Sequence, residues 1–161
     1  MEVTDIQFYG VPTAVGYFKN AEDEIGIDRG IIMTTGAVTQ TGTFVGVDNV
    51  GNAFASSDNN ATAANNDPDL QAISTNQVFN AAKYVITFIP TSDTLRFNYI
   101  WASEEYPEWA CTSFNDVFGF FLSGPGISGP YENNGINLAI IPGTNLPVAI
   151  NNLHPQNGAG C

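Results

Sequence analysis

Residues 99–124, Tyr-Ile-Trp-Ala-Ser-Glu-Glu-Tyr-Pro-Glu-Trp-Ala-Cys-Thr-Ser-Phe-Asn-Asp-Val-Phe-Gly-Phe-Phe-Leu-Ser-Gly, place an acidic loop between two apolar runs. The aromatic and β-branched residues of these runs predict strands over Thr94–Ala102 and Val117–Ser123. The loop between them concentrates carboxylate and amide side chains, from Glu104, Glu105, Glu108, Asn115 and Asp116. Carboxylates gathered this closely repel one another unless they are solvated or bound to a cation. A calcium site and a solvated acidic loop are therefore both open interpretations.

Outside this stretch, short apolar or alternating runs recur between turns rich in Gly, Pro and Asn. They predict strands over Val3–Tyr9, Ala14–Phe18, Ile25–Thr35, Lys83–Ile89, Ile136–Ile141 and Pro147–Ile150. The turn Pro90–Asp93 predicts a hairpin between Lys83–Ile89 and the strand that begins at Thr94. One short helix is predicted over Leu70–Ala82, with Asp69 as its N-cap. We therefore expect an all-β fold, a jelly-roll-like antiparallel β-sandwich with long loops and at most one short helix.

The composition fits one domain over residues 1–161, because this length buries a substantial core and 43% of the residues are hydrophobic. Sixteen acidic residues against four basic ones give a net charge of −12. This charge repels nucleic acid and anionic membranes, so neither is an expected partner. The sequence also contains no apolar run long enough for membrane insertion.

The two cysteines, Cys111 and Cys161, lie fifty positions apart outside any Cys-x-x-Cys context. Such a pair favours one disulfide over a zinc site. The only histidine is His154, which argues against a His-based zinc or catalytic site. A disulfide is typical of oxidising compartments, so we expect a secreted protein.

A second acidic point precedes the predicted helix, at Asp67-Pro68-Asp69. Pro68 stiffens this turn and holds two carboxylates on it, although both could simply cap the helix and satisfy turn amides. We expect calcium as cofactor, bound by side chains from both acidic points: Asp67, Asp69, Glu104 and Glu105, followed by Asp116 and Glu108.

No catalytic residues are predicted. Two carboxylates of the loop could serve a glycosidase, but carboxylates clustered this closely are more often cation ligands. We therefore expect a protein that is not an enzyme. Trp109 and Tyr106 are candidate glycan contacts, since aromatic rings stack on sugars, although packing beneath the loop is the simpler role for either ring.

The segments Ala102–Glu108 (Ala-Ser-Glu-Glu-Tyr-Pro-Glu) and Ser113–Pro125 (Ser-Phe-Asn-Asp-Val-Phe-Gly-Phe-Phe-Leu-Ser-Gly-Pro) resemble the choice-of-anchor L domain, a family of bacterial cell-surface domains. Further matching pieces occur in the family's order along nearly the whole chain: Gly10–Ala14, Gly16–Phe18, Gly30–Gly36, Asp67–Leu70, Phe88–Pro90, Asp93–Leu95, Ile140–Thr144 and Pro147–Asn151.

The resemblance implies a secreted module that precedes a C-terminal sorting or anchoring signal, often in gliding or adhesion proteins. We expect a structural or adhesive cell-surface module, with a carbohydrate-binding module as the alternative. Family members continue past the position of Cys161 with further strands, so this domain is expected to lack its last strands. Open strand edges recruit strands from other chains. Other copies or other chains of an extracellular filament or larger surface assembly are therefore expected partners, unless the missing strands belong to the same polypeptide.

Overall fold

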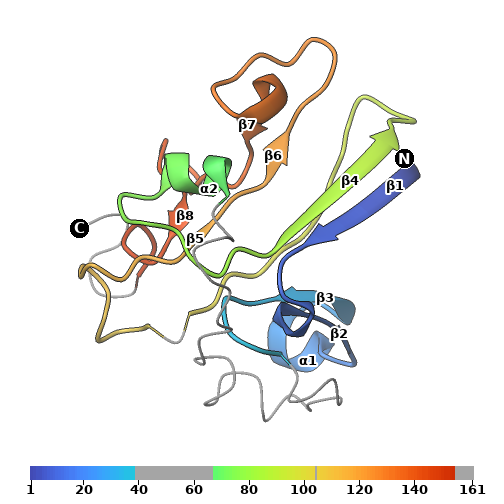
Figure 1. Ribbon diagram of the computed structural model, residues 1–161. Helices are drawn as coiled ribbons and strands as arrows, with labels where there is room; N and C mark the ends of the chain where they lie inside the picture. Colours follow the sequence, from blue (N-terminus) through green and yellow to red (C-terminus); the bar gives the residue numbers. More distant parts are fainter. Residues whose placement is uncertain (39–66, 104, 155–161) are drawn as a thin grey trace. The chain divides into compact units, whose positions relative to one another are not determined.

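The computed structural model of the chain (Figure 1) describes residues 1–38, 67–103 and 105–154. These residues form two compact units, and each unit combines two separate stretches of the chain. The first unit contains the described residues up to 38 together with 80–102. The second contains the described residues 67–79 and 103–154. The prediction of one domain over residues 1–161 stays a prediction.

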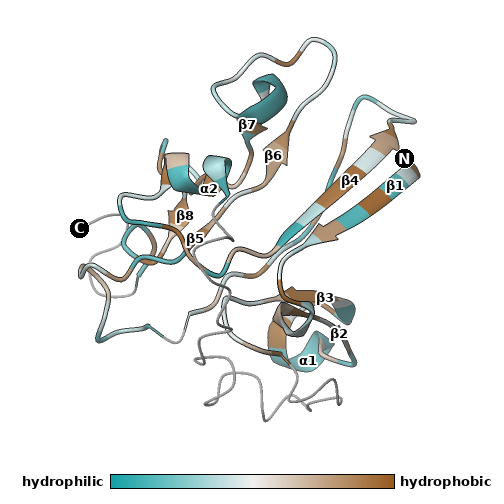
Figure 2. Ribbon diagram, viewed as in Figure 1, coloured by the Kyte–Doolittle hydropathy of each residue, from teal (hydrophilic) through white to brown (hydrophobic). Residues whose placement is uncertain are grey.

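The longest ladder of the first unit pairs β1 (Glu2–Tyr9) with β4 (Lys83–Ile89) in antiparallel register. β1 mixes apolar and polar residues, whereas β4 is apolar apart from Lys83 and Thr87; Figure 2 shows the resulting changes of colour along the two strands. A bulge shifts the register between Val3 and Asp5. Both strands were predicted, but β4 was expected to pair with Thr94–Ala102 in a hairpin. That pairing is absent from the described ladders, and β4 pairs with β1 instead.

The second ladder of this unit pairs β2 (Val15–Lys19) with β3 (Arg29–Met33), after a 3-10 turn at Pro12–Ala14. Between the two strands lies α1 (Glu22–Ile25), a single helical turn. Gly26 ends this turn at φ 73°, a conformation that glycine adopts without strain. The sequence predicted at most one short helix. This prediction is wrong, because the described residues contain both α1 and a second helix, α2 (Pro68–Ile73). The acidic residues in the first turn of α1 favour the helical N-terminus.

The second unit begins with α2 (Pro68–Ile73). Its N-cap is Asp67 rather than the predicted Asp69, and the helix ends at Ile73, well before Ala82. The Asp67 carboxylate accepts hydrogen bonds from the backbone N–H groups of Asp69 and Leu70, both at 3.0 Å. Pro68 fits the first helical position, where its missing N–H is not needed.

Two short ladders complete the second unit: β5 (Val117–Phe118) with β8 (Val148–Ala149), and β6 (Phe121–Leu122) with β7 (Ile136–Asn137). A turn at Glu132–Asn134 precedes β7. The predicted strand Val117–Ser123 is thus interrupted at Gly119, where a β-carbon would lie 2.3 Å from the Phe121 ring. The buried side chains of this unit include Val78, Ala139, Ile141, Val148, Ala149 and Ile150.

The described residues are therefore mostly β, in two-stranded antiparallel sheets, without a long helix. The jelly-roll sandwich stays a prediction. Within the described part of the chain, none of the helices has the length and apolar character needed to span a membrane.

Candidate functional site

The acidic loop of the second unit folds back on itself before β5. The backbone N–H of Trp109 donates to the Glu105 carbonyl at 2.9 Å. Both the N–H and the Oγ1 of Thr112 donate to the Trp109 carbonyl, at 3.2 and 2.6 Å. These local bonds satisfy backbone groups that the tight turns would otherwise leave without partners.

Residues that follow β8 hold the loop in place. Asn151 accepts from the backbone N–H of Cys111 at 2.7 Å and donates its amide N–H to the Thr112 carbonyl at 3.0 Å. Its own backbone N–H donates to the Asn115 side chain at 2.9 Å. One asparagine therefore joins three points of the loop to the segment after β8.

Two further contacts join the same segments. The Tyr106 hydroxyl donates to the Leu153 carbonyl. Cys111 Sγ lies 3.6 Å from Nε2 of His154, whose side chain is only 5% exposed. The sequence singled out Cys111 for a disulfide, but Cys161 lies outside the described residues, so this pairing stays a prediction. The bonding roles of Asn151 and His154 were not predicted, because nothing in the local sequence indicates a contact forty positions away.

Among the predicted calcium ligands, the structure brings Glu105 and Asp116 into electrostatic contact. Burial raises the pKa of the Asp116 carboxyl above its ordinary value. Burial also raises the pKa of Glu105, and the neighbouring charge of Asp116 raises it further. Both ionised groups are thus destabilised by their surroundings, and a bound cation would relieve that destabilisation.

The other predicted ligands are placed differently. Asp67 caps α2, and an oxygen of the buried Asp69 carboxylate accepts from the backbone N–H of Glu132 at 2.9 Å. Glu108 is exposed, and Glu104 lies outside the described residues. The described residues contain no group of three or more acidic, His or Cys side chains able to hold a metal ion. The structure therefore supplies a two-carboxylate pair, whereas calcium takes six to eight oxygens, including carbonyls and water.

The aromatic candidates have unequal roles. Trp109 is 49% exposed and packs edge-to-face against Phe114, which is 54% exposed, with ring centroids 5.1 Å apart. Tyr106 is half-buried and its hydroxyl donates to a backbone carbonyl, so its role is to stabilise the loop rather than to contact a glycan. Phe114 was missed as a candidate, although an apolar ring in a polar loop was a visible signal.

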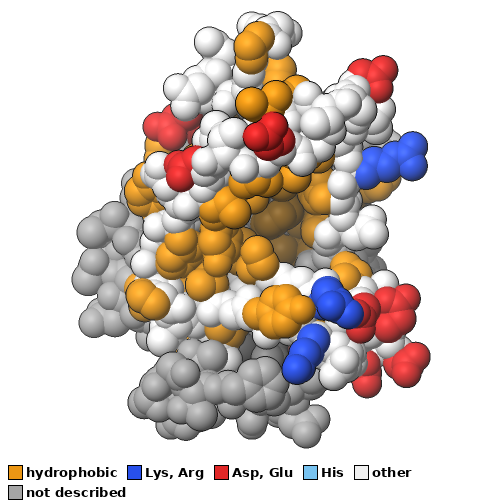
Figure 3. All heavy atoms as spheres, turned by 90° about the vertical axis from the view of Figure 1, so that its right-hand side faces the viewer, with side chains coloured by type: hydrophobic (Ala, Val, Ile, Leu, Met, Phe, Trp, Pro, Cys, Tyr) orange, Lys and Arg blue, Asp and Glu red, His pale blue; other side chains and the backbone are white. Residues whose placement is uncertain are grey.

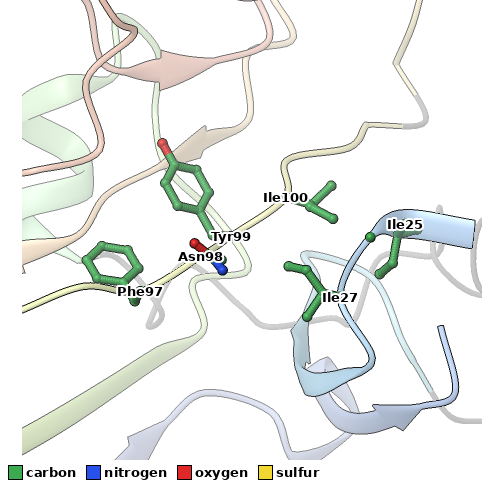
Figure 4. Close-up of a pocket in the computed structure, with 7 residues that line it drawn as sticks. Ile25, Ile27, Phe97, Asn98, Tyr99 and Ile100 are labelled. Carbon is green, nitrogen blue, oxygen red and sulfur yellow. The ribbon is translucent and has the colours of Figure 1, made fainter. Parts of the chain in front are cut away.

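The first unit has a shallow hollow of about 450 Å³, lined by residues 25–27 and 97–100. Figure 4 shows Ile25 at the end of α1 and Ile27 on the segment that follows, with Phe97, Asn98, Tyr99 and Ile100 on the other segment. Its lining side chains are apolar except for the Asn98 amide and the Tyr99 hydroxyl, yet polar atoms, including those of the backbone, make up more of its exposed lining than apolar atoms do. The hollow is wide open to solvent, unlike the sites that bury most of a small ligand.

Comparison with known proteins gives one family. The family model described as the choice-of-anchor L domain matches residues 1–161. No match was found among the curated proteins or among the solved structures.

Proposed function

Because the chain belongs to the choice-of-anchor L domain family, which implies a surface-anchored protein, we propose that it is a structural or adhesive module of a secreted bacterial surface protein. The observation that carries this proposal is the family match across all 161 residues. The role is non-enzymatic, and the partners are other copies or other chains of a surface assembly, including an extracellular filament.

The direct test is to locate the protein on intact cells. Antibodies against the module should label unpermeabilised cells, and added protease should remove the label. Deleting the module from its parent protein should reduce cell–cell or cell–surface attachment, while a deletion of equal length elsewhere serves as control. Labelling that requires permeabilised cells would refute surface exposure, and unchanged attachment would refute the adhesive role.

We also propose that calcium stabilises the acidic loop. The Glu105–Asp116 pair supports this, because each ionised carboxylate is disfavoured by burial or by the other charge. Asp67, Asp69, Glu104 and Glu108 are the remaining proposed ligands, and backbone carbonyls and water would complete the shell.

Thermal unfolding in chelator and in millimolar calcium tests this proposal. A cation that binds only the folded state raises the melting temperature. Asp116→Asn should abolish most of the calcium-dependent rise, whereas Glu108→Gln, at an exposed position, should abolish less. Equal melting temperatures with and without calcium would show that the pair is only an acidic surface feature.

A carbohydrate-binding module is the second candidate, favoured by the exposed Trp109–Phe114 pair. Edge-to-face rings with exposed surface present an apolar platform of the kind that stacks on sugars. On a glycan array, Trp109→Ala should abolish binding, whereas Tyr106→Phe should leave it unchanged. Absence of binding to any glycan by the calcium-loaded chain would exclude this candidate.

A further inference from the structure

Cys111, in the acidic loop of the second unit, carries a sulfur atom that faces a buried imidazole. The distance from Cys111 Sγ to Nε2 of His154 is 3.6 Å, which is within hydrogen-bonding range for sulfur. The side chain of His154 is buried, whereas Cys111 is exposed to solvent. A reagent can therefore approach Cys111 while the imidazole stays beside its sulfur.

The segment after β8 holds both members of this pair. Asn151, three residues before His154, accepts from the backbone N–H of Cys111 at 2.7 Å. Cys111 has φ 66°, a left-handed conformation that a residue other than glycine keeps only where its surroundings hold it. The Leu153 carbonyl, next to His154, accepts from the Tyr106 hydroxyl. Backbone contacts on both sides thus fix the position of the sulfur against the imidazole.

His154 is the only basic side chain of the second unit. All Lys and Arg residues of the chain, the type drawn in blue in Figure 3, belong to the first unit: Lys19, Arg29, Lys83 and Arg96. The acidic loop adds the carboxyl groups of Glu105, Glu108 and Asp116, whose negative charge disfavours a thiolate and which are weaker bases than imidazole. Any assistance to the ionisation of Cys111 by a basic group of this unit must therefore come from His154.

We propose that Cys111 is a thiol–disulfide exchange site with His154 as its base, and that a disulfide enters the molecule at this sulfur. In the reduced protein, the Cys111 thiol donates its proton to Nε2, in the imidazole tautomer that carries its proton on Nδ1. The thiolate then attacks one sulfur of a disulfide donor. The bond between the two donor sulfurs breaks, and its electron pair leaves with the second sulfur, which takes the proton from the imidazolium. The products are a mixed disulfide on Cys111 and one released thiol.

The predicted partner, Cys161, completes the exchange. Its thiolate attacks the Cys111 sulfur of the mixed disulfide, which forms the predicted bridge and releases the second donor thiol. Two protein thiols are thereby oxidised, and one donor disulfide is reduced to two thiols. The inference goes beyond the bridge itself, because it fixes the order of the two steps: Cys111 reacts first, since it has a base beside it.

Glutathione disulfide is the probe, added to the reduced full chain at neutral pH and quenched with acid before mass spectrometry. Cys161→Ser leaves only Cys111, and Cys111→Ser leaves only Cys161. The first variant should form its mixed disulfide roughly tenfold or more faster than the second, because a neighbouring base raises the thiolate fraction. In denaturing urea the two rates should become similar, since unfolding separates the sulfur from the imidazole.

Substitution of the base tests its role directly. Added to Cys161→Ser, His154→Gln should slow mixed-disulfide formation roughly tenfold. Tyr106→Phe is the matched control, because it removes another bond to the same segment but leaves the imidazole. The reaction rate should not change in this control. Equal rates at the two cysteines in native buffer, or a rate that His154→Gln leaves unchanged, would overturn the proposal.

Peptide mapping of the wild-type chain, quenched early in its oxidation, does not depend on the folding of any variant. The first glutathione should be found on Cys111. Glutathione that appears first on Cys161, or on both cysteines together, would also overturn the proposed order.

Discussion

Individual acidic side chains have two different roles in the second unit. The buried Asp67 side chain holds the first turn of α2 with two hydrogen bonds, and Asp69 joins that helix to the turn at Glu132. The ionised forms of Glu105 and Asp116 are instead disfavoured: burial raises the pKa of both carboxyls, and the charge of Asp116 raises the pKa of Glu105 further. Of these four acidic residues, two therefore hold the backbone and two carry charges that their surroundings disfavour.

Replacing Asp67 separates capping from cation binding. Asp67→Ala removes the N-cap and should lower the free energy of unfolding by about 1 kcal/mol. Asp67→Asn keeps a capping oxygen and should retain most of that stability in chelator. Urea unfolding of both variants, with and without calcium, checks this. Equal losses for Ala and Asn in chelator would mean that the carboxylate charge, not the cap, stabilises α2.

The pH dependence of stability follows from the raised pKa values of Asp116 and Glu105. Between the ordinary values of 3.8 and 4.5 and the raised ones, the folded state binds more protons than the unfolded chain. In chelator, the contribution of these groups to stability should therefore fall as pH rises through that window. Asp116→Asn should flatten the slope of unfolding free energy against pH, and Glu108→Gln should not. A wild-type slope in Asp116→Asn would contradict the assignment.

At the scale of elements, the loop before β5 depends on one side chain of the segment after β8. Asn151→Ala removes bonds to Cys111 and Thr112 and should lower the free energy of unfolding by about 1–3 kcal/mol. Asn152→Ala is the matched control, because Asn152 donates to the Pro147 carbonyl within its own segment. Chemical denaturation of both variants measures the difference. An equal loss of unfolding free energy would show that the bonds from Asn151 to the loop add no particular stability.

Local patterns predicted most strands of the chain but few of their partners. Alternation in Val3–Tyr9 and Lys83–Ile89 gave β1 and β4 nearly to the residue. The pairing of these strands joins distant positions, and alternation carries no information about which apolar strand faces which. For the same reason the hydrogen bonds between Asn151 and the acidic loop were not predicted. Glu105 and Asp116 were both predicted as ligands of one calcium, and the structure does place them close enough to interact electrostatically.

At the scale of the whole molecule, the predicted disulfide between Cys111 and Cys161 is the strongest single constraint. Closing a loop of about fifty residues should stabilise the fold by about 4 kcal/mol in the chain-entropy model. Reduction should therefore lower the melting temperature, and Cys111→Ser should reproduce that loss and be insensitive to reductant. Mass spectrometry that finds two free thiols in natively secreted protein would refute the pairing.

The ladder between β1 and β4 also pairs two strands that the ribosome synthesises at different times. β1 is complete when Tyr9 is made, but its partner β4 ends at Ile89. At synthesis rates of about 5–20 residues per second, the intervening stretch takes roughly 4–16 seconds. Hairpins form within about 1–10 microseconds, so for that whole interval β1 is a finished strand without its own partner. During that interval, chaperones, export factors and neighbouring nascent chains can reach β1 before β4 does.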